Sequence, residues 1–304
     1  MRFGGHETFA IREGWLHKGL KLLQEDPGCF NNEFVGDWLG VGPNMAKSIK
    51  HWLVATGVAE HVEERAYRKN PGLRQTDLGK VILEQDPFFT AIGTWWVLHI
   101  NLVNNSNFAT TWGWFFNNIN LGRFEKSVCI DGLRRYLQVT NIKIPSNNTL
   151  ERDLSCLLSS YSEKIPPDHL DPEDAQDCPF IELGLMTNYR NSGYYHLNFA
   201  PKEIPPYVFS YAIAAINGLS QGKGMVDIPL STIARQQGGP GRCFILTSES
   251  LFETMQKMES YEIKDPIEIV GHAGERAIRI KKREPLVWLK MYYSAGEKGD
   301  RCAA

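Results

Sequence analysis

Residues 31–58, which read NNEFVGDWLGVGPNMAKSIKHWLVATGV, have the pattern of a helix-turn-helix, and they constrain the fold more than any other stretch. A first helix is predicted over residues 33–39. The sequence GVGP interrupts it, because glycine adopts unusual backbone angles and proline begins a helix but does not fit inside one. A second helix is predicted to start at Asn44 or in the Pro43 turn and to end at Thr56.

The second of these predicted helices has two contrasting faces. Its apolar residues recur every three or four positions and share one side, namely Met45, Ile49, Trp52 and Leu53. The opposite side has no acidic residue and consists of Asn44, Lys47, Ser48, Lys50 and His51. A DNA major groove accepts such a face, and Asn44, Lys47, Lys50 and His51 are then the predicted contacts. Plain packing or protein contact uses the same geometry, so both interpretations stay open.

The stretch after this helix pair predicts a wing. Residues 60–74 alternate charged and small side chains and include Arg68 and Lys69, and the following sequence LRQTDLGKVIL predicts a closing helix. Basic side chains on such a hairpin contact phosphates, which positions a protein on DNA without reading its sequence. We therefore predict a winged-helix-like DNA-binding domain over residues 1–90.

Composition and charge exclude several classes of protein. The formal net charge of −2 over 304 residues excludes a strongly basic nucleic-acid coat protein, so DNA contact must come from local charge asymmetry. No apolar run is long enough for a transmembrane helix, and the polar N-terminus does not resemble a signal peptide. Six scattered cysteines form no CxxC pair, which favours free thiols in a reducing cytoplasm over disulfides or a zinc site.

The middle region, predicted over residues 91–200, is rich in aromatic side chains. Aromatic rings stack on bases in single-strand binders, but the helical spacing here favours a helical hairpin buried as core. A second helix-turn-helix-like unit is predicted over residues 124–162, and its Arg152 is a candidate DNA contact. An acidic loop follows, and CPFIELGL and SGYYHLNF predict two strands.

The last region, predicted over residues 201–304, has a mixed α+β pattern with winged-helix-like features. Helices are predicted over residues 205–217 and 228–236, and GGPGRCFIL predicts a turn that leads into a strand. Strand pairs are predicted near the end of the chain. The basic candidates for DNA contact in this region are Arg242, Lys281 and Lys282. The predicted class is α+β, mostly α, with winged-helix or helix-turn-helix-like units around an aromatic-rich helical centre.

Six motifs occur in a characteristic order: GHETFAIREGWLHKG, LGVGPNMAKSIKHW, TTWGWFFN, TLERDL, DCPFIELGL and GGPGRCFIL. In this order, from residue 3 to about residue 292, they resemble the uncharacterised-domain family of phosphorothioation gene clusters. That family includes the SspB-type proteins of the bacterial single-stranded DNA phosphorothioation system. The resemblance implies a cysteine desulfurase and an ATPase as partners. It also implies that the protein nicks DNA and so opens one strand for sulfur incorporation.

A nickase needs an activated water and compensation of charge on the phosphate, which divalent ions held by carboxylates usually supply. Mg²⁺ or Mn²⁺ is the expected cofactor. The acidic segment supplies the candidate catalytic residues Glu173, Asp174 and Glu182, and the candidate metal ligands are Asp153, Glu173 and Asp174. A solvated loop, or a docking surface for a basic partner, explains the same charges.

Two functions therefore remain after the sequence has been considered. The first is a cytoplasmic DNA-binding protein of the phosphorothioation machinery that nicks DNA. The second is a non-catalytic adaptor or transcription-type regulator that binds DNA and recruits partner enzymes.

His6 and Glu7 lie just before the first long predicted helix. Such a pair is suited to metal binding, to acid–base chemistry or to the simple holding of a loop.

Overall fold

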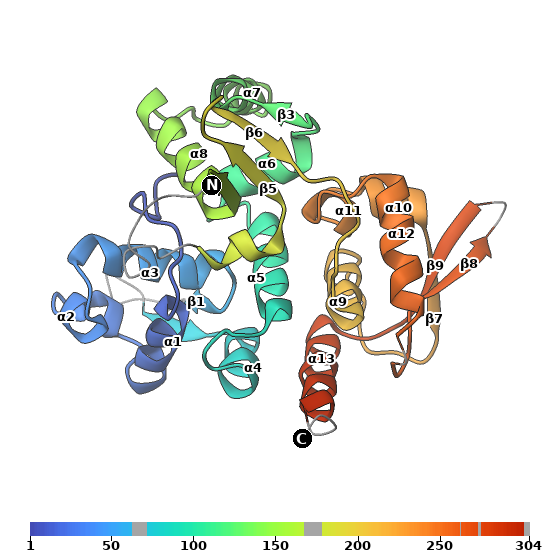
Figure 1. Cartoon of the computed structure of the whole chain (residues 1–304). Helices are drawn as coiled ribbons and strands as arrows, with labels where there is room; N and C mark the ends of the chain where they lie inside the picture. Colours follow the sequence, from blue (N-terminus) through green and yellow to red (C-terminus); the bar gives the residue numbers. More distant parts are fainter. Residues whose placement is uncertain (63–71, 167–177, 262, 273–274, 301–304) are drawn as a thin grey trace. The chain divides into compact units, whose positions relative to one another are not determined.

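The computed structural model contains two compact units, Met1–Leu197 and Asn198–Ala304 (Figure 1). It describes residues 1–62, 72–166, 178–261, 263–272 and 275–300, with only the backbone at residues 272 and 297–300. The first unit contains the predicted N-terminal region and the predicted middle region as far as Leu197. The class is α+β with mostly helical content and small sheets, as predicted.

The first unit is built mainly from helices. Its α-helices are α1 Trp15–Glu25, α2 Val35–Leu39, α3 Pro43–Ala55, α4 Asp77–Gln85, α5 Ile92–Asn104, α6 Thr110–Asn118, α7 Lys126–Val139 and α8 Asn147–Tyr161. Its 3₁₀ helices are η1 Cys29–Asn31 and η2 Pro179–Leu183. Its strands are β1 Ala59–His61, β2 Leu73–Gln75, β3 Arg123–Phe124, β4 Ser162–Ile165, β5 Met186–Tyr189 and β6 Tyr194–Leu197.

The helices α2 and α3 form the predicted pair. Gly40 ends α2 in the left-handed conformation, with φ of 68°, and Pro43 opens α3. The strands β1 and β2 pair antiparallel, and Thr76 caps the N-terminus of α4 by accepting a hydrogen bond from the Gly79 amide. These elements follow one another in the predicted order, and the winged-helix assignment stays a prediction. Arg68 and Lys69 lie outside the described residues.

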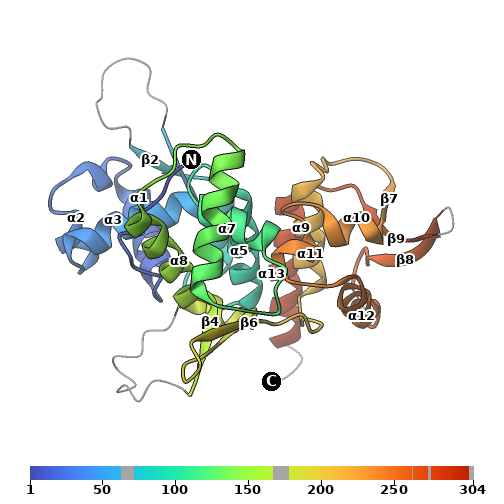
Figure 2. The same ribbon diagram turned by 90° about the horizontal axis from the view of Figure 1, so that it is seen from above.

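Aromatic side chains of α5 and α6 form the core of the first unit, as the spacing predicted. Trp96, Trp112 and Phe115 are each at most 2% exposed. The buried ring of His99 bonds through Nδ1 to the Tyr161 hydroxyl at 2.8 Å, which joins α5 to the end of α8. Figure 2 shows α7 and α8 in the same unit, where they pack against each other.

A four-stranded sheet completes this unit, with the order β3-β6-β5-β4 and a parallel pairing between β4 and β5. The predicted first strand, CPFIELGL, is wrong over its whole length. Pro179 begins the 3₁₀ helix η2 and Gly184, with φ of 61°, ends it, so the strand β5 starts only at Met186. Glu182 therefore lies on a helical turn.

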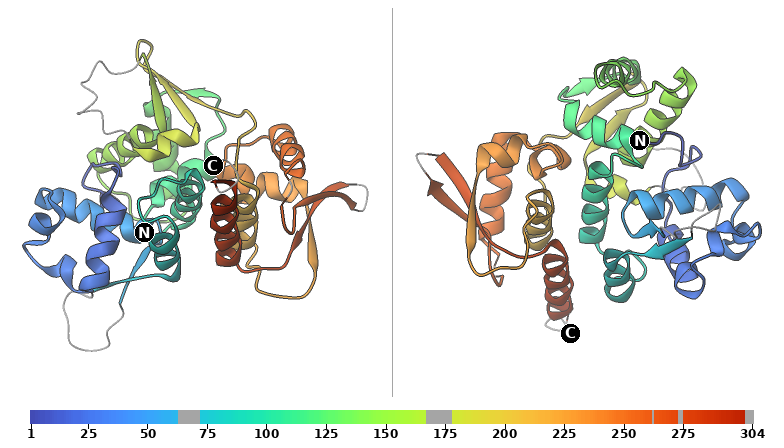
Figure 3. Two further views of the ribbon diagram at one scale, coloured as in Figure 1. Left: turned by 60° about the horizontal axis from the view of Figure 1, so that its bottom comes forward. Right: turned by 180° about the vertical axis from the view of Figure 1, so that it is seen from behind.

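The second unit pairs a three-stranded sheet with helices. Its helices are α9 Pro206–Ile216, α10 Leu230–Arg235, α11 Pro240–Cys243, α12 Ser248–Glu259 and α13 Pro285–Asp300. Its strands are β7 Met225–Pro229, β8 Glu268–His272 and β9 Glu275–Lys281, in the antiparallel order β7-β9-β8. Figure 3 shows α9 and α13 side by side, and the two helices pack against each other.

Three local predictions for the second unit are corrected. The helix predicted from residue 228 begins at Leu230, because Ile228 pairs with Ile278 in the sheet. Within GGPGRCFIL, residues Pro240–Cys243 form the short helix α11, where proline occupies the first turn, and the described chain has no strand between α11 and α12. The terminal helix α13 replaces a predicted strand and buries Trp288 and Leu289.

Two further features bear on the class of protein. Five cysteines of the described chain are buried thiols that form no disulfide, namely Cys29, Cys129, Cys156, Cys178 and Cys243. Over the described ranges, the helices are too short or too polar for any of them to cross a membrane.

Candidate nucleic-acid interface

The helix α3 buries its apolar face and exposes part of its polar face. Ile49, Trp52 and Leu53 are completely buried. Asn44 and Lys47 are exposed, and the Lys47 ammonium donates to the Asn44 side-chain oxygen at 3.3 Å. This places two of the four predicted groove contacts of α3 in solvent.

The expected orientation of His51 is corrected. This side chain is 4% exposed, and its ring lies 5.1 Å from that of Trp52 and 6.1 Å from that of His6, measured between centroids. The N-terminal segment around Gly5 covers this part of α3. The periodicity of a single helix does not predict burial by a segment that lies elsewhere in the sequence. His51 therefore belongs to the interior edge of a pocket, where it does not share the exposed face of Asn44 and Lys47.

That pocket, which we call the α3 pocket, has a volume of about 260 Å³. Its lining residues are Arg2, Gly5, Glu7, Lys47, Lys50, His51, Val54, His61 and Phe108. Lys50 is half-buried and donates to the Asn31 side-chain oxygen at 3.3 Å. The pocket thus combines three cationic side chains and two imidazole rings with one carboxylate.

Neither ring nitrogen of His51 has a hydrogen-bond partner within the described chain, and the same holds for Nδ1 of His61. Burial, followed by electrostatic contributions from His6 and Arg2, lowers the pKa of His51 to about 3. Burial also lowers the pKa of Lys50, with Arg2 as the next cause, and it lowers the pKa of His61. His51 is therefore a neutral ring at pH 7.

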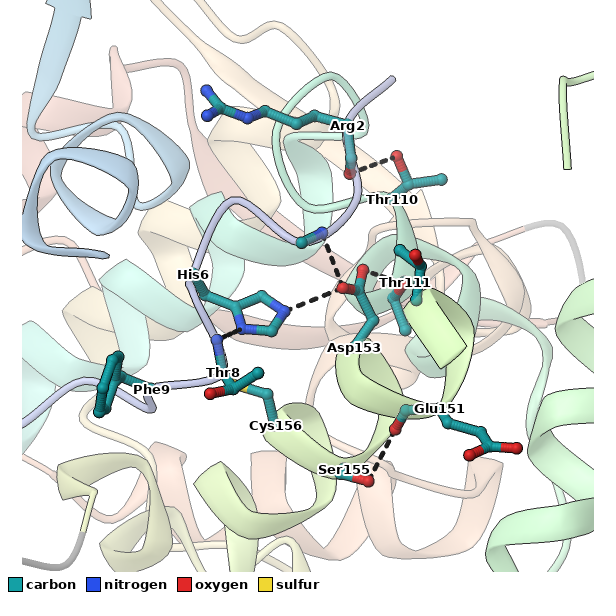
Figure 4. Close-up of polar contacts among 12 residues, drawn as sticks. Arg2, His6, Thr8, Phe9, Thr110, Thr111, Glu151, Asp153, Ser155 and Cys156 are labelled. Atoms are coloured by element: carbon teal, nitrogen blue, oxygen red, sulfur yellow. Dashed lines mark hydrogen bonds and ion pairs between the residues drawn. The ribbon is translucent and has the colours of Figure 1, made fainter. Parts of the chain in front are cut away.

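A buried hydrogen-bond network holds the N-terminal segment in place behind this pocket (Figure 4). Oδ1 of Asp153 accepts hydrogen bonds from the Gly4 amide at 2.8 Å and from His6 Nε2 at 2.9 Å. Oδ2 of the same carboxylate accepts the Thr111 hydroxyl at 3.0 Å. In Figure 4 the Arg2 side chain extends away from Asp153. The network positions the backbone from which Arg2 reaches the α3 pocket.

The tautomer of His6 follows from its second contact. The Thr8 amide donates to Nδ1 at 3.0 Å, so Nδ1 is an acceptor and the proton lies on Nε2, which donates to Asp153. His6 therefore holds a loop, the third of the three roles that the sequence left open. The sequence contains no signal for this partner, because 147 residues separate the two side chains.

The predicted acidic site is only partly within the described chain. Glu182 is exposed on η2, whereas Glu173 and Asp174 lie outside the described residues. Asp153 is 2% exposed and already accepts three hydrogen bonds. Over the described ranges, no three His, Cys, Asp or Glu side chains are placed to hold a metal ion. The described donors therefore do not fit a metal site on their own.

The remaining predicted DNA contacts are spread over both units. Arg152 is exposed on α8, and Arg242 is half-buried on α11. Lys281 forms an ion pair with Asp265 at 3.0 Å, whereas the neighbouring Lys282 is exposed.

Other basic side chains near β9 have partners within the second unit. Arg279 binds the carboxylate of Asp227 through two hydrogen bonds of 2.8 Å, and Arg276 lies over the Phe252 ring at 4.0 Å. Arg283 also pairs with Asp265. Tertiary contacts thus neutralise part of the positive charge that the sequence concentrates in this segment.

Comparisons with known proteins were made on the sequence and on the fold. None of the curated proteins compared with the chain matches it. A crystal structure described as "Magnesium ion-bound SspB crystal structure" has a TM-score of 0.81 and 23% identity, covering 96% of this chain and 87% of that one. A second, "SspB crystal structure", has the same TM-score and coverage with 24% identity. At this identity the likeness shows a shared fold.

The family comparison covers nearly the whole sequence. The family described as "Protein of unknown function (DUF4007)" matches residues 3–293. This agrees with the order of motifs from GHETF to GGPGR. The chain belongs to the DUF4007 family and has the fold of the SspB crystal structures.

Proposed function

We propose that this protein is a DNA-binding component of a bacterial phosphorothioate DNA-modification system, and that it nicks one strand to open it for sulfur incorporation. The observation that carries the DNA-binding part is the cationic surface of α3, where exposed Lys47 adjoins a pocket with Arg2 and Lys50. Positive side chains gathered on one helix of a slightly acidic chain favour a polyanion by local charge. The likeness to SspB structures over 96% of the chain supports the assignment to this system.

The nicking step rests on the resemblance to SspB-type proteins and on the acidic segment that includes Glu182. On this proposal Mg²⁺ or Mn²⁺ is the cofactor, and a cysteine desulfurase and an ATPase are the partners. Carboxylates of the acidic segment would hold such an ion, which would supply activation of a bound water and compensation of charge on the phosphate.

A non-catalytic adaptor that recruits those enzymes to DNA is the second candidate. One observation favours it: Asp153, a predicted metal ligand, already has its carboxylate engaged by Gly4, His6 and Thr111. Both candidates share the DNA-binding surface and differ only in whether this chain cleaves a strand.

A plasmid assay separates the two candidates. Purified protein is incubated with supercoiled plasmid in Mg²⁺, in Mn²⁺ and in EDTA, and DNA affinity is measured in parallel by gel shift. Metal-dependent conversion to the open circle supports the nickase. Binding without conversion, together with retention of the ATPase or the desulfurase in a pull-down, supports the adaptor. Failure to bind DNA contradicts both.

A further inference from the structure

We propose that the α3 pocket binds a single phosphate group, which Arg2, Lys50 and His51 hold together. The proposal rests on the proposed DNA-binding function only for the source of the phosphate. The binding site itself follows from the geometry of the pocket.

Burial leaves the hydrogen-bonding capacity of the His51 ring unused among the described residues. The ring is 96% removed from solvent, yet both of its nitrogens lack a hydrogen-bond partner within the described chain. Buried polar atoms are almost always paired, because an unpaired one keeps the full cost of its desolvation. An anion in the pocket would supply the missing acceptor for one N–H of this ring.

The side chains of Arg2 and His51 converge at Gly5. A Cβ atom at this position would overlap Nδ1 of His51 and would lie 2.9 Å from Nε of Arg2, so both side chains approach the same bare backbone. Burial is the first cause of the lowered pKa values of Lys50, His51 and His61, and the charge of Arg2 contributes to each. The repulsion between the Arg2 and Lys50 cations is relieved when an anion enters.

Two further charged side chains line the pocket. Lys47 adds a third cation, and Glu7 is the carboxylate among the lining residues. The positive side chains therefore outnumber the negative one, and the Lys50 ammonium donates to the Asn31 side-chain oxygen, which carries no charge. The balance favours an anionic ligand over a cation.

The chemistry and size of the pocket point to phosphate. A guanidinium binds two oxygens of one tetrahedral anion in a fixed fork, and an ammonium adds a point charge. The volume of about 260 Å³ is smaller than the roughly 300–1,000 Å³ of sites that enclose whole small molecules. The apolar walls, Val54 and Phe108, bound a space suited to one phosphate group, while the rest of a nucleotide stays outside.

The test follows the histidine side chains by NMR in the full-length protein, with the His51 signals assigned by their loss in His51→Phe. The probes are inorganic phosphate, a short single-stranded oligonucleotide with a 5′-phosphate, and the same strand with a 5′-hydroxyl, all at equal ionic strength in chloride. The variants are Arg2→Met and Lys50→Met. The matched control is Lys80→Met, which removes an exposed lysine of α4 that pairs with Asp77. Unchanged His6 signals show that each variant is folded.

Phosphate is expected to shift the His51 signals and to raise the pH at which they titrate. Arg2→Met and Lys50→Met are each expected to weaken this binding roughly tenfold, or about 1.4 kcal/mol, while Lys80→Met leaves it unchanged. A response to both oligonucleotides identifies a backbone diester as the source, and a response to the 5′-phosphate strand alone identifies a strand end.

Unchanged His51 signals with every probe would overturn the proposal, as would equal weakening in Lys80→Met. Gel shifts on the same samples separate this failure from that of the proposed function. If DNA still binds while the His51 signals do not change, the proposed phosphate site is wrong and the proposed DNA binding is supported. If neither phosphate nor DNA binds, both are wrong.

Discussion

Nε2 of His6 lies 2.9 Å from Oδ1 of Asp153, and this contact joins the N-terminal segment to α8 across 147 residues of sequence. Both side chains are buried, with 2% and 3% of their surfaces exposed. The same carboxylate holds the Gly4 amide, so it sets the path of the backbone between Arg2 and Gly5. Because those two residues border the α3 pocket, the integrity of the pocket depends on a group on another helix.

Asp153→Ala is expected to destabilise the first unit by about 3 kcal/mol, because it leaves three donors unpaired at roughly 1–3 kcal/mol each, less where solvent reaches them. The measurement is urea unfolding. Asp131→Ala is the control, since its carboxylate is exposed and pairs only at the surface with Arg134, and it should change stability by less than about 0.5 kcal/mol. Equal stability of the two variants would show that the buried network contributes little.

His51 is expected to make the protein less stable in acid. Its pKa is lowered from 6.5 to about 3 by burial in the folded state, so between these values the unfolded chain binds the extra proton. The resulting stability is fully present above pH 6.5 and is lost as the pH falls toward 3. His51→Phe should reduce the slope of unfolding free energy against pH by up to one proton, about 1.4 kcal/mol per pH unit.

Chemical denaturation at several pH values between 4 and 7 checks this, at roughly half-unit spacing. Parallel profiles for the wild type and His51→Phe would mean that the ring is accessible to protons in the folded state.

Lys47→Ala together with Lys50→Ala is expected to weaken DNA binding and to lower the slope of log affinity against log salt by roughly one to two. The physical reason is the release of fewer counterions when fewer phosphates are neutralised. Lys47 is exposed and bonds only to Asn44 within its own helix, so folding should be almost unaffected. Gel-shift titrations at several salt concentrations measure the slope, and an unchanged slope would remove α3 from the interface.

Lys282→Glu is expected to reduce DNA affinity equally on all sequences, because an exposed lysine contacts backbone phosphate without reading bases. Lys281→Glu is a less specific test of DNA contact, since this substitution also breaks the ion pair with Asp265. Comparing affinities on two unrelated duplexes tests the prediction. Loss on one duplex only would mean that Lys282 reads sequence.

Glu182→Ala, and likewise Glu173→Ala and Asp174→Ala, are expected to abolish nicking without weakening DNA binding if the protein is a nickase. Removing a carboxylate takes no positive charge away from phosphate contacts. If the protein is an adaptor, these changes instead weaken the binding of a partner protein whose basic surface contacts the acidic segment. Nicking assays beside pull-downs distinguish the cases, and normal results in both would leave the acidic segment as a solvated loop.

The sequence by itself determined the helices with strong periodicity and the burial of the aromatic centre. Ile49, Trp52 and Leu53 recur at helical spacing, and this local regularity is sufficient to predict that these three side chains are buried. The order of motifs was likewise sufficient to identify the family, because it depends on residue identity alone. The prediction of a strand at residue 179 failed because a proline and a later glycine favour a helical turn there.

Only the tertiary structure decided how the candidate site is built. His51 has a polar position on the helical wheel of α3, and it is buried because the N-terminal segment crosses it at Gly5. In the sequence, Asp153 is indistinguishable from other acidic residues of a helix. In the structure, its carboxylate accepts hydrogen bonds from Gly4, His6 and Thr111. Periodicity reports contacts within a few turns, whereas burial and pairing at these residues depend on segments that lie far apart in the sequence.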